Sequence, residues 1–175
     1  MKIPADHQGM TELFRKLGAR DPEQWASSQL SEGIPQLQRF LVLREVWKLV
    51  ISDSDYHWMD AAIERAKERP REPFAGVGLA LKRVLDGGAT REDIIEIVRG
   101  EQVKLLFDLL CLIDGTGPKH LEDEVRGFDY RLFQTNHDES PDLLIGGLHE
   151  SVLETDPTGR EMRPRDFGRS GSSRE

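Results

Sequence analysis

Apolar residues recur every three or four positions along the first two thirds of the chain, which is the spacing of side chains on one face of an α-helix. The pattern is densest between residues 35 and 51, where few positions stay polar, so we expect this helix to be surrounded by others. Its apolar positions are Leu37, Phe40, Leu41, Val42, Leu43, Val46, Trp47, Leu49, Val50 and Ile51.

Four further segments, 11–30, 58–69, 74–85 and 90–113, show the same spacing and predict helices. Asp21-Pro22 is typical of a helix start, with the aspartate as cap and the proline in the first turn. Thr90 with Asp93 approximates a capping box, and Gly87-Gly88 is a typical helix end. Whether Gly100 divides the last helix is left open by the pattern.

The segment from Val103 to Ile113 is apolar apart from Lys104 and Asp108, which predicts burial on nearly every side. The Gly76-Val77-Gly78 triplet lacks the preceding strand of a phosphate-binding loop. A close approach of two helices explains these glycines better.

After position 118 the periodicity weakens and the charge becomes acidic. Residues 114–142 carry eight acids against three bases. Residues 130–135 are consistent with a short strand, and Asp156-Pro157-Thr158-Gly159 fits a type I turn that we expect to close a small hairpin. The sequence therefore predicts a mainly α fold: a compact multi-helix orthogonal bundle with an irregular or small β-hairpin C-terminal segment.

We expect a single helical domain over residues 1–165, with an irregular acidic portion at 119–165, and a flexible tail over 166–175. The net charge of -8 disfavours general binding to nucleic acid or to anionic membranes. Because the chain offers no apolar run long enough for a signal peptide or a bilayer span, we expect a cytoplasmic protein. Cys111, the only cysteine, lies in an apolar run and is expected to be a small buried side chain.

A first group of candidate side chains gathers before and within a predicted helix start: Asp53, Asp55, His57 and Asp60. Carboxylate and imidazole ligands in this arrangement are a candidate site for a divalent metal. The competing interpretation, which the sequence favours, is ordinary helix capping, since such residues also satisfy free backbone amides. The spacing fails the calcium-loop pattern.

A second group, His149, Glu150 and Ser151, follows a flexible Gly146-Gly147 pair and is our candidate binding site. The zinc-protease motif that begins at His149 is broken by Leu153. The competing interpretation is a capped turn that enters a short strand. Asp108 is a further candidate, because a carboxylate within an apolar helix must face water, find a partner such as Lys104, or line a cavity.

Three functions remain open on these grounds. The leading hypothesis is a non-catalytic protein that binds another protein, with no cofactor, and with a possible homodimer formed through Phe40, Leu43 and Trp47 or through Leu106 and Leu110. The second is an enzyme or divalent-metal-binding protein in which His149 and Glu150 converge with Asp53, Asp55 and His57. The third is competition by the acidic segment 114–142 for a basic surface.

Overall fold

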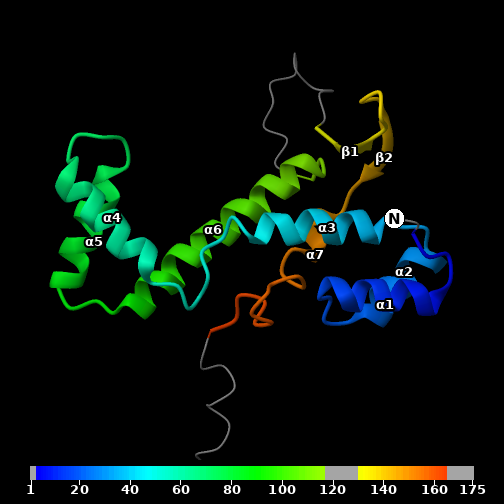
Figure 1. Ribbon diagram of the computed structural model, residues 1–175, viewed down its shortest axis with the longest axis horizontal. Coiled ribbons are helices and arrows are strands. Elements are labelled where there is room, and N and C mark those ends of the chain that lie inside the picture. Colours follow the sequence, from blue (N-terminus) through cyan, green and yellow to red (C-terminus); the bar gives the residue numbers. More distant parts are fainter. Residues whose placement is uncertain (1–2, 117–129, 165–175) are drawn as a thin grey trace, which may run out of the picture. The chain divides into compact units, whose positions relative to one another are not determined.

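The chain is mainly helical, with one small antiparallel sheet near its C-terminal end, as predicted (Figure 1). The computed structural model describes residues 3–116 and 130–164. Its contacts form two compact units, one made of residues up to 49 and from 105 onward, the other of residues 50–104. We describe each unit by itself, and the expectation of a single domain stays a prediction.

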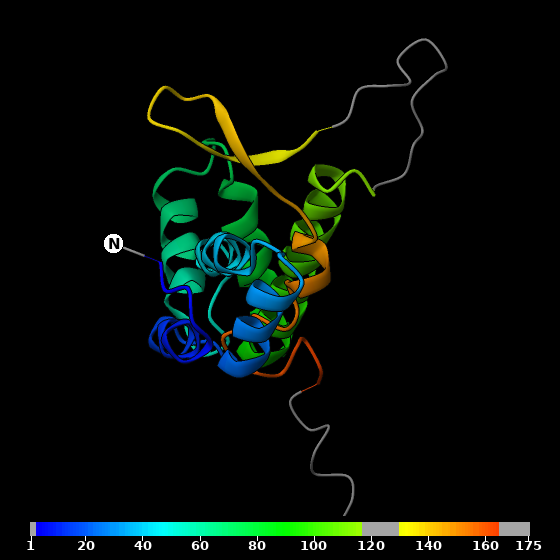
Figure 2. The same cartoon turned by 90° about the vertical axis from the view of Figure 1, so that its right-hand side faces the viewer.

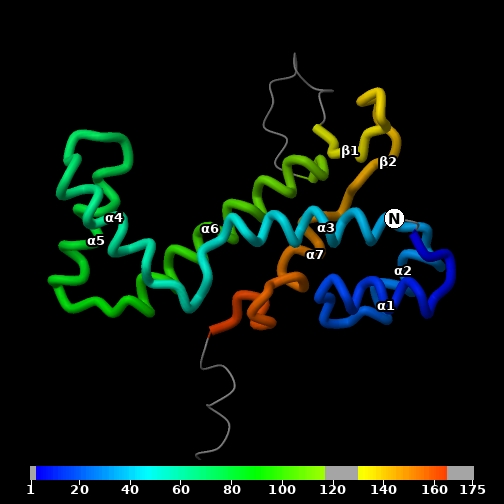
Figure 3. Tube along the Cα trace, viewed as in Figure 1, coloured from blue at the N-terminus to red at the C-terminus, as the bar shows by residue number. Residues whose placement is uncertain are grey.

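The first unit begins with α1 (His7–Leu17), α2 (Pro22–Ser31) and α3 (Gln36–Trp47). Asp21 caps α2 by accepting a hydrogen bond from the Gln24 amide at 3.2 Å, and Pro22 occupies the first turn, as predicted. Gly18 ends α1 with a left-handed φ of 93°, which a glycine adopts without a Cβ clash. The turn that follows brings α1 and α2 side by side (Figure 3).

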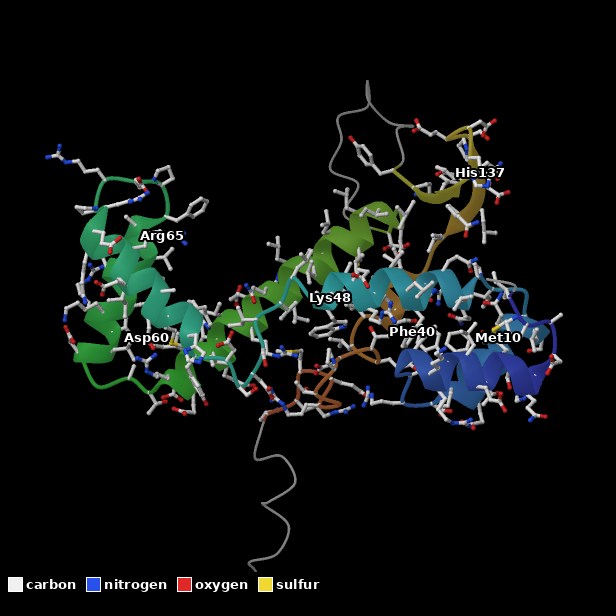
Figure 4. The ribbon with its side chains drawn as sticks, viewed as in Figure 1. Met10, Phe40, Lys48, Asp60, Arg65 and His137 are labelled. Carbon is white, nitrogen blue, oxygen red and sulfur yellow. The ribbon has the colours of Figure 1, made fainter. Side chains whose placement is uncertain are left out.

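Three aromatic rings form the centre of this helical core. Phe14, Trp25 and Phe40 come from α1, α2 and α3, and their ring centroids lie 5.2–5.8 Å apart in tilted and edge-to-face pairs. Met10 packs in the same cluster, and Figure 4 labels Met10 and Phe40 on their helices. Edge-to-face pairs add about 0.5–1.5 kcal/mol each beyond the burial of their area. These contacts fix the mutual positions of the three helices.

The residues predicted for a homodimer surface lie mostly in the core. Phe40, Leu43, Trp47 and Leu110 are each less than 7% exposed, and Leu106 is half-buried. They are therefore not available as an interface. The dimer itself stays a prediction.

One unbroken helix, α6 (Arg91–Ile113), contains Gly100 without interruption, which settles the open question of its continuity. Its residues 105–113 belong to the first unit. The prediction that 103–113 is buried on nearly every side is wrong: Val103 and Leu110 are buried, but Leu105, Leu109 and Leu112 are exposed. The composition of a helix does not show how many other elements of the fold pack against it. Cys111 is half-buried and free.

A hairpin of β1 (Leu132–Thr135) and β2 (Pro141–Ile145) follows, and it confirms the strand expected at 130–135 (Figure 2). The hairpin predicted around Asp156 to Gly159 is wrong, because Val152 and Leu153, expected in its first strand, lie in a turn that follows a short helix, α7 (Leu148–Ser151). The turn itself is confirmed by a hydrogen bond from the Gly159 amide to the Asp156 carbonyl at 2.9 Å. The buried Asp156 carboxylate stabilises this turn by accepting hydrogen bonds from the amide and the hydroxyl of Thr158. The turn is therefore present, but no strands flank it in the described part of the chain.

The second unit contains α4 (His57–Glu68), α5 (Ala75–Asp86) and the first part of α6. Its core consists of Met59, Leu81, Ile94 and Ile95. Thr90 accepts a hydrogen bond from the Asp93 amide at 3.1 Å, which confirms the predicted cap at the start of α6.

A glycine sets the distance between α4 and α5. A Cβ added at Gly78 would overlap the Ala62 carbonyl and lie 2.7 Å from the Ala66 Cβ. Gly76, on the same helix, has open space around its Cβ position. The close helix approach predicted for this triplet is therefore confirmed, and it rests on Gly78 alone.

Replacing Gly78 with alanine should force α4 and α5 apart and lower the free energy of unfolding by about 1–3 kcal/mol, the usual range for overpacking. Urea unfolding followed by circular dichroism measures this change. Gly76→Ala is the matched control: it should be neutral or stabilising by up to about 1 kcal/mol, because alanine favours a helix interior. Equal effects of the two substitutions would contradict this account of the packing.

Candidate functional site

The predicted binding residues His149, Glu150 and Ser151 lie on α7, which the chain enters through Gly147 at a left-handed φ of 69°. A Cβ at Gly147 would lie 2.7 Å from the Arg39 Cζ and 2.9 Å from a Glu150 carboxylate oxygen. Glycine is thus required both by the backbone angle and by the space that the arginine fills. The expected strand after this turn is replaced by the helix, because residues 148–151 pack inward through Leu148 and Ser151.

His149 forms a short contact with Asp114, just beyond the end of α6. The imidazole Nδ1 lies 2.6 Å from the Asp114 Oδ2, and the His149 amide donates to the same oxygen at 3.0 Å. The Asp114 side chain is 3% exposed and that of His149 18%. A carboxylate accepts only, so the neutral imidazole holds its proton on Nδ1 and leaves the Nε2 lone pair available.

Two further features define the surroundings of this pair. The Phe107 ring meets the imidazole edge to face, with centroids 6.0 Å apart. The second oxygen of Asp114, Oδ1, is buried without a hydrogen-bond partner among the described residues. The histidine is therefore held in one orientation by a carboxylate and an aromatic ring.

Arg39 of α3 lies against the same helix and is 8% exposed. Its Nε donates to the Gly146 carbonyl at 2.8 Å and its Nη1 to the Ser151 Oγ at 3.5 Å. A carboxylate oxygen of the exposed Glu150 lies 3.9 Å from the Nη1 of Arg39. We call Arg39, Asp114, His149, Glu150 and Ser151 the α7 cluster.

The other predicted residues are not part of the α7 cluster. Asp108 is exposed on α6. Asp55 accepts a hydrogen bond from the His57 amide at 2.9 Å, which is a helix-start contact, and Asp60 pairs with Arg91 at 2.6 Å. Within residues 3–116 and 130–164, no three His, Cys, Asp or Glu side chains are grouped so as to hold a metal ion. The metal site at Asp53, Asp55, His57 and Asp60 stays a prediction.

Two cavities lie between α2 and the segment 151–161, and we call them together the α2 groove. The larger has a volume of about 400 Å³ and the smaller about 270 Å³. Both are lined by Gln24, Trp25 and Glu154, and the smaller is also lined by Ser151 of the α7 cluster. A carboxylate is thus common to both cavities.

Burial raises the pKa of Glu154 above its ordinary value, and the neighbouring carboxylates of Asp21 and Glu161 act in the same direction. Arg20 and a hydrogen bond from Trp25 partly offset this shift. The folded chain therefore holds a proton on Glu154 more readily than the unfolded chain does. Ionised Glu154 costs stability, and that cost appears as the pH rises through the folded pKa.

Replacing Glu154 with glutamine should raise the melting temperature at pH 7 by about 1–2 °C, because the neutral amide removes this cost while solvent screening keeps the effect small. The gain should shrink as the pH falls and vanish below about pH 4, where glutamate is protonated in both states. Calorimetry over this pH range measures it. Glu12→Gln, on the exposed side of α1, controls for the change in net charge, and a destabilised E154Q at pH 7 would contradict the assignment.

Sequence reasoning missed Arg39 and Asp114. The apolar helix at 36–47 contains two cations, Arg39 and Arg44, and its pattern did not show that Arg39 is the buried one that needs partners. Asp114 gave no signal either, because an aspartate followed by glycine after a helix is equally typical of a turn.

Comparisons with known proteins give no relative. No family model, no curated protein and no solved structure matches the chain. In the described part of the chain, no helix has the length and apolar character that a bilayer crossing requires.

Proposed function

We propose that this chain acts by binding another protein through three leucines on α6. Leu105, Leu109 and Leu112 are 68%, 47% and 48% exposed. Their spacing of four and then three residues places them in one row along the helix. We call this row the α6 stripe, and its exposure is the observation that carries the proposal.

A row of large apolar side chains in water is the form of surface that helix-in-groove and helix-helix recognition uses. The opposite side of the helix is occupied, since Val103 and Leu110 are buried. The stripe is therefore the side of α6 that a partner can cover without disturbing the core. Because each leucine is already partly buried, its complete burial in a complex contributes less than the about 1.5–3 kcal/mol of a fully exposed leucine, before the costs of association.

Charge favours a basic partner over a second copy. The chain carries a net charge of -8, which repels another copy and attracts a cationic surface. Exposed Glu101, Lys104 and Asp108 lie close to the stripe on the same helix, so its border carries two acids and one base. We therefore assign the stripe to an amphipathic helix of a partner whose apolar face is bordered by lysine or arginine.

A designed peptide with leucines at this spacing and lysines on its other face is a direct probe. Leu109→Asp, at the centre of the stripe, should raise the dissociation constant of the labelled peptide by at least about tenfold in fluorescence anisotropy, because a carboxylate would be desolvated in the interface. Leu49→Asp is the matched control, since Leu49 is 72% exposed and lies outside α6.

Equal peptide binding by the two variants would overturn the assignment of the stripe. Light scattering on the same samples tests the other occupant. A dimer of the wild-type chain that Leu109→Asp dissociates would assign the stripe to a second copy in place of a basic helix.

A second candidate function, acid-base chemistry, is supported by the Asp114–His149 contact. A carboxylate on Nδ1 orients an imidazole and stabilises its charged form, which is the relation of the acid and base in hydrolytic triads. The 2.6 Å separation and the low exposure of Asp114 satisfy this geometry. In this role His149 would accept a proton at Nε2.

Asp114→Asn should disturb the tautomer, because an amide can present a donor to Nδ1, and should slow acylation of His149 by diethyl pyrocarbonate about tenfold. Mass spectrometry of the modified peptides measures the rate, with exposed His57 as the reference in the same sample. Nitrogen NMR that places the His149 proton on Nε2 in the wild-type chain would overturn the acid-base candidate.

A further inference from the structure

Most of the charged residues that line the α2 groove are acids. In the larger cavity the lining includes Asp21, Glu154 and Glu161, and in the smaller it includes Glu32 and Glu154. Among the described lining residues Arg20 is the one base, and it donates to the carbonyls of Gly159 and Glu154 and contacts the Glu161 carboxylate. Arg163, outside the lining, also contacts Glu161 at 2.8 Å. The potential in the groove is therefore negative, which favours a cation.

A buried amide provides an independent observation. Gln36 is 8% exposed and lines the smaller cavity. Its Nε2 donates to the Ser28 Oγ at 2.8 Å, but its carbonyl oxygen is buried without a partner among the described residues. A buried acceptor without a donor costs about 1–3 kcal/mol. A ligand that brings an N–H or O–H to this position removes that cost.

We propose that the α2 groove binds a cationic group rich in N–H donors, an alkylammonium or a guanidinium. Its positive charge would be matched by Glu154 and the acids on either side of it, and its N–H donors would satisfy the Gln36 carbonyl. The two sources of this chemistry are a free polyamine and a lysine or arginine side chain of a peptide. The inference does not depend on the α6 stripe, which lies on another element.

The spread of the acids favours an extended cation over a metal ion. In the part of the chain that the structure describes, no three acidic side chains come close enough to share one ion. Glu32 and Glu161 line different cavities, and Glu154 is common to both. A polyamine or a long side chain, whose charges and donors are several ångströms apart, fits such a distribution.

The raised pKa of Glu154 agrees with the binding of a cation in the α2 groove. Burial and neighbouring carboxylates raise its pKa, so the groove holds this charge at a cost. A bound cation offsets that cost by supplying an opposite charge next to the Glu154 carboxylate.

Calorimetric titration of the full chain at low salt tests the proposal with three probes: spermidine, a capped tetra-arginine peptide, and Mg²⁺ alone. Spermidine or the peptide should bind with one-to-one stoichiometry and change the fluorescence of Trp25, which lines both cavities. Glu154→Gln should raise the dissociation constant about tenfold, the usual loss for a hydrogen bond to a charged group.

Gln36→Met, which removes the unpaired carbonyl, should weaken binding about fivefold. Glu12→Gln is the matched control, with the same charge change outside the groove, and should stay within about twofold of the wild-type value because distant exposed charges are screened. Thermal melts of each variant exclude unfolding as the cause, and Glu154→Gln is expected to be at least as stable as the wild-type chain.

The relative affinities of the two organic probes identify the source. A peptide that binds much more tightly than spermidine assigns the groove to a basic side chain of a protein, and the reverse order assigns it to a free polyamine. Three results would overturn the proposal. The first is an equal loss of affinity in Glu154→Gln and Glu12→Gln. The others are binding of Mg²⁺ as tight as that of the organic cations at the same charge, and no binding of any probe at low salt.

Discussion

The attachment of the C-terminal segment to α3 is the constraint on which the α7 cluster and the α2 groove both depend. Arg39 and Trp47 lie on the buried face of α3 and donate to the carbonyls of Gly146 and Val152 at 2.8 and 2.9 Å. These bonds hold α7 against the helix and so determine where its side chains lie. A buried guanidinium without such acceptors is costly, so the attachment and the folded core require each other.

The sequence predicted the helices well because their determinants are local. Capping residues such as Asp21 and Thr90 satisfy the first free amides of a helix, and apolar spacing fixes its inner face. Such signals depend on neighbours three or four positions away. The predicted strand at 130–135 was found for a similar reason, whereas the hairpin at 156–159 was wrong because the same turn signal serves other flanking structures.

The sites were harder to predict, since their residues meet across long separations in the chain. His149 and Asp114 are 35 positions apart, and Arg39 and Gly146 are 107 apart. Residue type alone selected His149 but not its carboxylate partner. The exposed leucines of α6 were also missed, because an apolar helix segment has the same sequence pattern whether the fold buries it or leaves it exposed to solvent.

The 107-residue separation between Arg39 and its acceptor at Gly146 has a consequence during synthesis. At typical translation speeds, about 5–20 s pass between the emergence of α3 from the ribosome and that of its acceptors. In that interval the aromatic core of Phe14, Trp25 and Phe40 can form by itself, since all three helices are already made. The bonds of the Arg39 guanidinium and the Trp47 indole to the C-terminal segment can form only after Gly146 and Val152 have emerged, so α7 docks last.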